Sequence, residues 1–246
     1  MACRLVSAAQ STNFAAVLPN LPAMSAPHRL PNLLFDFGGV IINIDYNRTL
    51  EAMRALSRAG STIEFTQAAQ AALFDDLETG RLTPAGFRQG LRTHYDLHHA
   101  TDAELDAAWN AMLLDVPLQR LEYLQELRRQ GYQTALLSNT NSIHIAVINE
   151  MLRREYALDK GIADVLDRVF YSQEVGMRKP GPEIFEHVLR EMNWRPEETL
   201  FIEDSIQHIH TAERLGIRTL FLPPPATLTE ALPAALRAFP DPVSGR

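Results

Sequence analysis

The sequence predicts an α/β protein: a doubly wound parallel sheet with a small helical cap subdomain inserted after the first strand. Short apolar runs alternate with stretches of helical periodicity over residues 31–45 and 115–225, which is typical of parallel strands covered by helices on both faces. Residues 46–114 interrupt that alternation with helical pattern and no convincing strand. A chain of 246 residues, 46% of them hydrophobic, can bury one substantial core.

The predicted strands are the apolar runs themselves. The first covers residues 33–35, and residues 40–42 are expected to extend it beyond a glycine turn. Short apolar runs with helical stretches between them predict the later strands, at residues 134–137, 169–171, 199–202 and 219–222.

Helical stretches separate these strands. One is opened by Pro117 and closed by Gly131, residue types that favour helix starts and ends. Apolar residues at helical spacing predict a second helix around residues 184–192 and a third from residue 206 to Gly216. Right-handed crossovers are expected between the strands.

The insertion at residues 46–114 follows the carboxyl end of the first strand, so it is expected to lie over the mouth of the sheet as a cap. Residues 1–30, rich in Ala, Ser and Pro, are interpreted as a loose extension, because polar residues interrupt any apolar core of a secretory signal. Residues 226–246 are expected to form a C-terminal helix and a tail.

Composition narrows the function classes. No stretch approaches the roughly 20 apolar residues that span a bilayer, so no membrane span is predicted. The net charge of −7 disfavours nucleic acid as a partner, whereas a local cationic cluster still permits a small anionic substrate. Cys3 is the only cysteine, which excludes an internal disulfide and fits a cytoplasmic protein. The oligomeric state cannot be read from the sequence.

Ligands of open parallel sheets bind at the carboxyl ends of the strands, and two polar clusters there carry single functional groups. Asp36 follows the first strand and precedes Gly38 and Gly39, which places a carboxylate beside a backbone that a ligand can approach closely. Ser138 ends the next strand and is followed by Asn139. An Asp-led turn and a helix cap are the plain alternatives.

Two further clusters carry charge. Lys179 is held in an extended approach by the proline that follows it, with a solvated surface lysine as the alternative. Glu203 and Asp204 adjoin at the end of a buried strand, where two carboxylates repel unless a cation offsets them. Mg²⁺ is the simplest such cation; a capping role for Asp204 is the alternative.

The order Asp, Ser, Lys and paired acids resembles the haloacid dehalogenase superfamily of phosphatases, over about residues 32–222. The likeness is sharpest in FDFGGVIINIDYNR, LLSNTN, GMRKP and FIEDS, and LETGRLTP resembles its capped subgroup. Within that subgroup the chain is similar to bacterial sugar-phosphate phosphatases, particularly those resembling glucose-1-phosphate phosphatase.

The resemblance implies a nucleophile and a metal site. Asp36 is expected to attack phosphorus and form an aspartyl phosphate. Mg²⁺ is expected on Asp36, the main-chain carbonyl of Gly38 and Asp204, with Glu203 a ligand directly or through water.

The resemblance also implies substrate contacts. Ser138 should donate to a phosphoryl oxygen, with Gly39 and the backbone amide of Asn139 nearby, and Lys179 should bridge Asp36 and the phosphoryl group.

Where the core passes into the cap, Asp45, Tyr46 and Arg48 are expected to touch the substrate, although Arg48 also fits an ordinary surface charge. Phe87 and Trp109 are expected in the core of the cap and not as sugar-stacking platforms.

One departure from the family pattern concerns the proton donor. The family usually carries a second Asp two positions after the nucleophile, where this chain has Gly38. General acid–base catalysis is worth about 10² to 10⁴ in rate, or about 3 to 5 kcal/mol. Three explanations are open: an activated leaving group such as an anomeric hydroxyl, another donor such as Asp45 or His144, or weak catalysis.

The predicted function is a Mg²⁺-dependent phosphomonoester hydrolase acting on a small phosphorylated metabolite, a sugar phosphate above all. A phosphomutase of the same superfamily and a catalytically weak phosphate-binding homologue are the alternatives. The pair Glu203–Asp204 weighs against a dehalogenase, which needs no metal. The retention of Asp36, Ser138, Lys179 and Asp204 weighs against a dead site.

Overall fold

The computed structural model describes residues 30–57 and 67–240 and confirms the predicted fold class. Within these ranges, five parallel strands form one sheet in the order β3-β2-β1-β4-β5. The strands are β1 (Asn32–Phe35), β2 (Thr134–Ser138), β3 (Arg168–Tyr171), β4 (Thr199–Glu203) and β5 (Arg218–Phe221). None of the helices within the described ranges is both long and apolar enough to cross a bilayer.

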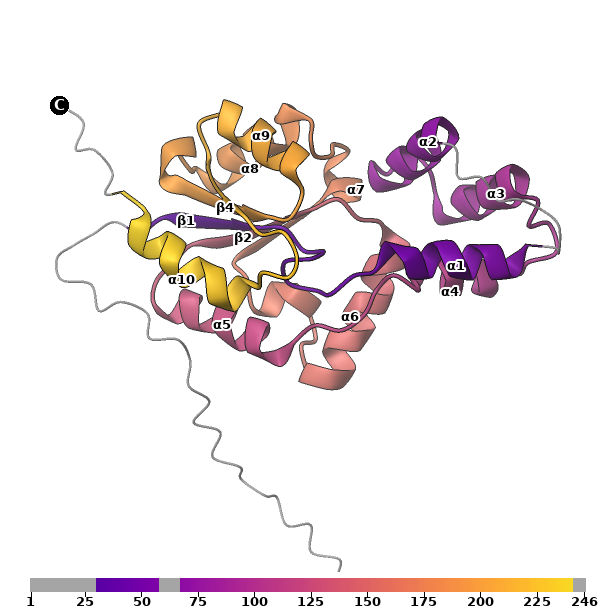
Figure 1. Cartoon of the computed structure of the whole chain (residues 1–246), viewed down its shortest axis with the longest axis horizontal. Coiled ribbons are helices and arrows are strands. Elements are labelled where there is room, and N and C mark those ends of the chain that lie inside the picture. Colours follow the sequence, from indigo (N-terminus) through magenta and orange to yellow (C-terminus); the bar gives the residue numbers. More distant parts are fainter. Residues whose placement is uncertain (1–29, 58–66, 241–246) are drawn as a thin grey trace, which may run out of the picture.

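Helices cover both faces of the sheet (Figure 1). Alternate residues of a strand point to opposite faces, so Leu33 and Phe35 belong to one buried cluster and Leu34 to another. The first cluster is completed by α5 (Leu118–Arg129), α6 (Ser142–Tyr156) and α10 (Leu228–Ala238), and the second by α8 (Pro182–Met192) and α9 (Ile206–Arg214).

The helices begin and end at residue types that favour helix ends. Helix α5 begins directly after Pro117 and ends before Gly131, whose φ of +91° suits glycine. Helix α6 begins directly after Asn141, whose side chain accepts from the backbone N–H groups of Ile143 and His144, each at 3.1 Å. This cap stabilises the helix that follows the Ser138 turn.

The prediction that residues 40–42 extend the first strand is wrong. The chain turns back at Gly39, with φ +74°, and Gly39 N donates to Ile42 O at 2.9 Å. The N–H groups of Ile41 and Ile42 both donate to Phe37 O, at 2.8 and 2.9 Å. The apolar run is buried in this tight turn, and burial on all sides gives a turn the same apolar signature as a central strand.

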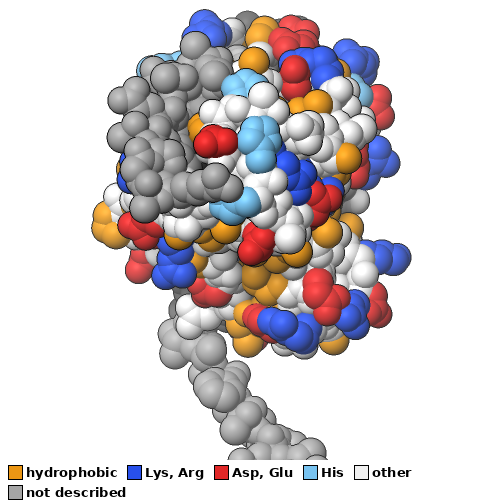
Figure 2. All heavy atoms as spheres, turned by 90° about the vertical axis from the view of Figure 1, so that its right-hand side faces the viewer, with side chains coloured by type: hydrophobic (Ala, Val, Ile, Leu, Met, Phe, Trp, Pro, Cys, Tyr) orange, Lys and Arg blue, Asp and Glu red, His pale blue; other side chains and the backbone are white. Residues whose placement is uncertain are grey.

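The described residues of the insertion form four helices: α1 (Tyr46–Leu56), α2 (Gln67–Glu78), α3 (Pro84–Tyr95) and α4 (Asp102–Asn110). They gather at one end of the sheet (Figure 1) and share a separate buried cluster that contains Met53, Leu91 and Leu105. Phe87 belongs to that cluster and is fully buried, as expected. Seen from the cap end, acidic and basic side chains are interspersed on the visible surface (Figure 2).

Parts of the predicted organisation fall outside the described residues. Residues 1–29 of the expected extension, residues 58–66 of the insertion and residues 241–246 of the tail are not described. The proposed division of the chain at residues 46, 115 and 226 stays a prediction.

Candidate active site

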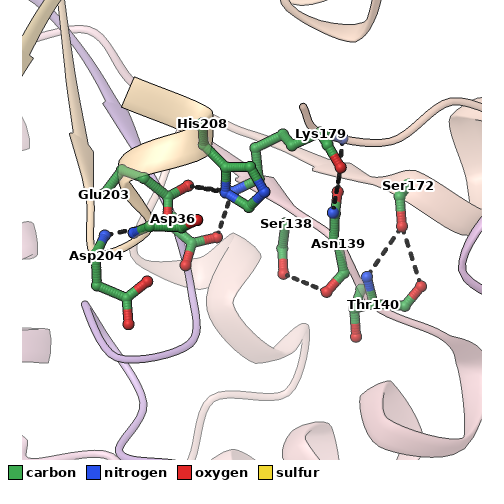
Figure 3. Close-up of polar contacts among 10 residues, drawn as sticks. Asp36, Ser138, Asn139, Thr140, Ser172, Lys179, Glu203, Asp204 and His208 are labelled. Atoms are coloured by element: carbon green, nitrogen blue, oxygen red, sulfur yellow. Dashed lines mark hydrogen bonds and ion pairs between the residues drawn. The ribbon is translucent and has the colours of Figure 1, made fainter. Parts of the chain in front are cut away.

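Most of the predicted site residues, among them Asp36, Ser138 and Lys179, lie together at the carboxyl edge of the sheet (Figure 3). Asp36 directly follows β1, and β1 pairs with both β2 and β4, which end at Ser138 and Glu203. Lys179 enters from the loop between α7 (Ser172–Val175) and α8. The parallel sheet therefore brings together side chains that are far apart in the sequence.

Lys179 is a buried cation between two carboxylates. Its side chain is 1% exposed, and Nζ lies 2.6 Å from Asp36 Oδ1 and 2.7 Å from Glu203 Oε2. Burial disfavours the ammonium form, but the charges of Asp36 and Glu203 outweigh it and raise the pKa of Lys179. The alternative of a solvated surface lysine is thereby excluded.

Asn139 holds the backbone of Lys179 with its side chain. Its Nδ2 donates to Lys179 O at 2.8 Å, and Lys179 N donates to Asn139 Oδ1 at 2.9 Å. Next to it, Thr140 N donates to Ser172 Oγ at 2.9 Å, and that hydroxyl donates back to Thr140 O at 3.1 Å. The predicted role of Asn139 involved only its backbone amide.

Glu203 has both carboxylate oxygens occupied. Oε1 accepts from the N–H groups of Asp204 and Ser205 at 3.1 and 3.0 Å, and Oε2 is 2.9 Å from His208 Nδ1 and 2.7 Å from Lys179 Nζ. Burial alone would raise the pKa of Glu203, but Lys179 and His208 together lower it to about 2. Sequence reasoning missed His208, although its place in the first turns of the helix after Glu203–Asp204 was a usable signal.

Three carboxylates form the one acidic cluster of metal-binding size among the described residues. Ligand oxygens of Asp36, Glu203 and Asp204 lie within 4.8 Å of one another. Burial and the charge of Glu203 raise the pKa of Asp36 to about 6, against the opposing effect of Lys179. Burial and Asp36 likewise raise the pKa of Asp204 to about 7.

Crowded, buried carboxylate oxygens that resist ionisation suit a hard divalent cation, so the donor set fits Mg²⁺. The packing is tight as well: a Cβ at Gly39 would lie 2.1 Å from Asp204 Oδ2. Because Glu203 already accepts on both oxygens, its role as a ligand stays a prediction.

A cavity of about 550 Å³ adjoins this cluster and is bounded by core and cap. Gly38 and Ser138 line it from the core, and Phe74, Glu78 and Trp109 line it from the cap. Ser138 is buried, and its hydroxyl makes only a long contact of 3.4 Å with the carbonyl of Asn139. That hydroxyl is therefore available to a ligand in the cavity.

Asp45 and Arg48 are not among the residues that line the cavity, and their contact with substrate stays a prediction. Asp45 caps α1, where its Oδ1 accepts from Asn47 N at 3.0 Å, and Arg48 Nε lies 3.7 Å from Asp45 Oδ2 at the surface. Residues three and four apart share a helix face, and the face toward the cavity is the one with Tyr46, Thr49 and Leu50.

His144 is in the cavity wall but is poorly suited to donate a proton. Its Nδ1 lies 2.8 Å from Asn110 Oδ1, and its ring stacks on Trp109 at a centroid distance of 4.8 Å. Burial lowers the pKa of His144 to about 4, so the ring is neutral near pH 7. Trp109 belongs to the cap core, as expected, and also lines the cavity.

Glu78, the last residue of α2, is a charged group of the site that sequence reasoning missed. Its Oε2 lies 3.0 Å from Arg178 Nη2, and Arg178 also pairs with Asp75. Burial raises the pKa of Glu78 to about 7, with Lys179 lowering it and Asp36 raising it. The phrase LETGRLTP contains this residue, but a local motif does not show that its carboxylate faces the nucleophile.

The chain also matches a known protein family. The family model of haloacid dehalogenase-like hydrolases matches residues 31–216. The chain is similar to the D-ribitol-5-phosphate phosphatase of Bacteroides thetaiotaomicron, with 34% identity over 193 residues that cover 77% of this chain and 90% of that protein.

Solved structures of the same family superpose on this chain. A haloacid dehalogenase family enzyme of Bacteroides thetaiotaomicron superposes with a TM-score of 0.71 at 36% identity, over 78% of this chain and 93% of that one. The same enzyme in complex with magnesium and inorganic phosphate superposes with a TM-score of 0.69 at 34% identity, over 79% and 94% of the two chains. With its match to the family model and its shared fold, this chain belongs to the haloacid dehalogenase-like hydrolases.

Proposed function

We propose that the protein is a Mg²⁺-dependent phosphomonoester hydrolase that forms an aspartyl phosphate at Asp36. The observation that carries this proposal is the buried Lys179 ammonium, 2.6 Å from Asp36 Oδ1, beside a cavity lined by Ser138 and Gly38. Its support from relatives is the phosphatase named above and the related enzyme's complex with magnesium and inorganic phosphate.

The residues divide the work of phosphoryl transfer, which needs positioning and charge neutralisation above all. Lys179 binds Oδ1 of Asp36, so Oδ2 remains to attack phosphorus in line. The Ser138 hydroxyl donates to a phosphoryl oxygen, and the Lys179 ammonium offsets the repulsion between carboxylate and phosphoryl group. Glu203 keeps the ammonium in place.

The metal site of this proposal consists of Asp36, the Gly38 carbonyl and Asp204, with Glu203 beside them. Mg²⁺ bound there supplies positive charge that neutralises the carboxylates and the phosphoryl oxygens. The raised pKa values of Asp36 and Asp204 support a cation at this position. Both acids must be ionised to attack phosphorus or bind metal, and a neighbouring cation favours their ionised forms.

For the substrate we propose a small phosphorylated metabolite, with sugar and polyol phosphates first. The cavity of about 550 Å³ is in the range of small-ligand sites. The relative's substrate, ribitol 5-phosphate, is an ordinary alkyl ester and not an anomeric one. This favours the view that a proton donor is present over the view that an activated leaving group makes one unnecessary. The single cysteine, Cys3, supports a cytoplasmic location.

The test is hydrolysis of 4-nitrophenyl phosphate by the wild type and Asp36→Asn, with Mg²⁺ and with excess chelator. We expect activity that requires Mg²⁺ and is lost in the variant. Phosphate release that persists in Asp36→Asn would exclude the aspartyl phosphate route. Absence of any chelator-sensitive activity would favour the phosphate-binding homologue.

A panel of sugar 1-phosphates, sugar 6-phosphates and polyol 5-phosphates then tests the substrate class. Following the phosphorus by ³¹P NMR separates hydrolysis from the phosphomutase alternative. A hydrolase releases inorganic phosphate, whereas a mutase moves the phosphoryl group to another position of the same sugar.

A further inference from the structure

Hydrolysis of an alkyl phosphate requires a proton for the leaving oxygen, and Gly38 has no side chain to supply it. The ionisable residues of the described chain that line the cavity are Tyr46, Asp75, Glu78, His144 and Arg178. His144 is neutral near pH 7, Arg178 does not give up its proton, and Tyr46 is 68% exposed. Two carboxyl groups remain, both on α2.

Of these two acids, Asp75 is committed to Arg178 in an ion pair. Glu78 Oε2 lies 3.0 Å from Nη2 of the same guanidinium but accepts no hydrogen bond from it or from any other described residue. A buried carboxyl oxygen that accepts no hydrogen bond is in a suitable environment to carry a proton itself.

The turn after Glu78 fixes the end of α2 against the core. A Cβ at Gly80 would lie 2.4 Å from Gln173 O, so the cap rests there on the backbone of α7. The chain continues from α7 to Arg178 and Lys179, so this contact holds the Glu78 carboxyl at the cavity that Gly38 and Ser138 line from the core.

We propose that Glu78 is the general acid and base of this enzyme, supplied by the cap in place of a carboxylate at position 38. This inference rests on the proposed hydrolase function. In the first step an Asp36 oxygen bonds to phosphorus, the bond from phosphorus to the leaving oxygen breaks, and that oxygen takes the Glu78 proton. The products are the alcohol, the aspartyl phosphate and the Glu78 carboxylate.

In the second step water takes the place of the alcohol. Its oxygen bonds to phosphorus, one of its protons passes to the Glu78 carboxylate, and the bond from phosphorus to Asp36 breaks. Inorganic phosphate leaves, and both acids return to their starting forms.

The electrostatic surroundings of Glu78 support this role. Burial raises its pKa to about 7, with Lys179 lowering it and Asp36 raising it, and a group that donates and then accepts works best near that value. The charged and titratable groups that face Glu78 are Asp36 and Lys179 from the core, Arg178 from the loop after α7, Asp75 from its own helix and Tyr46 from α1.

The experiment compares Glu78→Gln with the wild type on two esters, ribitol 5-phosphate and 4-nitrophenyl phosphate. Glutamine keeps the length and the contact with Arg178 but has no proton to give. We expect kcat for the alkyl ester to fall by about 10²- to 10⁴-fold. With the aryl ester, whose leaving group needs no proton, we expect a burst of nitrophenolate equal to the enzyme concentration, followed by slow turnover.

Asp75→Asn is the matched control, because it removes the other carboxylate of the same helix from the same Arg178. We expect it to change the two esters by one common factor and to give no burst. If Glu78→Gln also changed both esters equally and gave no burst, Glu78 would only anchor the cap and the proposal would be overturned.

Two readouts separate other failures from this one. Thermal unfolding of Glu78→Gln with and without Mg²⁺ and phosphate shows whether the variant is folded, and Glu78→Asp provides a second variant that keeps an acid. Loss of activity toward the alkyl ester in Glu78→Gln but not in Glu78→Asp supports the proposal, and equal loss in both contradicts it. Activity retained in Asp36→Asn would instead refute the proposed function itself, whatever Glu78 does.

Discussion

The side chain of Asn139 pairs with the backbone of Lys179 on both sides, donating from Nδ2 to its carbonyl at 2.8 Å and accepting at Oδ1 from its N–H at 2.9 Å. This pairing joins the loop after β2 to the loop before α8. It therefore fixes where the buried ammonium enters the site.

Substituting Asn139 should reduce catalysis without abolishing it. Asn139→Ala removes both hydrogen bonds, worth about 1 kcal/mol each, and we expect kcat to fall by about 10- to 100-fold with a smaller change in KM. Asn139→Asp keeps the acceptor oxygen, so its kcat should lie between those of the wild type and Asn139→Ala. Gln130→Ala, which removes an exposed hydrogen bond to Glu126, is the control. An Asn139→Ala enzyme with wild-type kcat would show that the pairing does not position Lys179.

Removing Lys179 should cost stability as well as activity. Lys179→Met leaves Asp36 and Glu203 without their cation, and breaking a buried ion pair from one side costs about 3 to 5 kcal/mol. In the variant both carboxyl groups are expected to have raised pKa values, so protonation relieves the repulsion and the loss should be smaller at pH 5 than at pH 8. Urea unfolding of both proteins at the two pH values measures this. A pH-independent loss would contradict the account.

Gly39 and Gly176 form a matched pair for testing the metal site. Their φ values are +74° and +76°, but a Cβ at Gly39 would lie 2.1 Å from Asp204 Oδ2, whereas a Cβ at Gly176 would have no atom within 4 Å. Alanine at either position should cost about 1 to 2 kcal/mol of backbone strain. Only Gly39→Ala should also displace Asp204 and abolish the stabilisation by Mg²⁺, measured as the shift in Tm on adding the ion. Loss of that shift in Gly176→Ala would point to a general effect of strain.

His144 should make stability depend on pH in the acid range. Burial lowers its pKa from 6.5 to about 4, so the unfolded chain binds this proton more readily than the folded protein does. The contribution is fully present above pH 6.5 and is lost as the pH falls through 4, about 3 kcal/mol in total. His144→Gln should flatten the unfolding free energy between pH 6.5 and 4. An unchanged slope in that variant would mean that other groups dominate.

The local pattern of the chain determined the sheet and the positions of its polar ends. Buried parallel strands must be apolar on both faces, so an apolar run such as residues 134–137 predicts a strand. A polar residue directly after such a run lies at the edge of the sheet where ligands bind. Asp36, Ser138 and Glu203 could therefore be predicted to lie at this edge of the sheet, and the family resemblance predicted that they share one site. The turn at residues 40–42 could not, because its burial gives it the pattern of a strand.

Only the tertiary structure decided which groups face one another. Lys179 and Asp36 are 143 residues apart in the chain; the family resemblance led us to expect that they meet, but no local pattern predicts the direct ion pair. The same holds for the carboxyl of Glu78 beside Arg178 and for the absence of Asp45 and Arg48 from the cavity lining. Local periodicity records burial and helix faces, whereas the partner of a charge and its pKa depend on distances that exist only after cap and core have packed together.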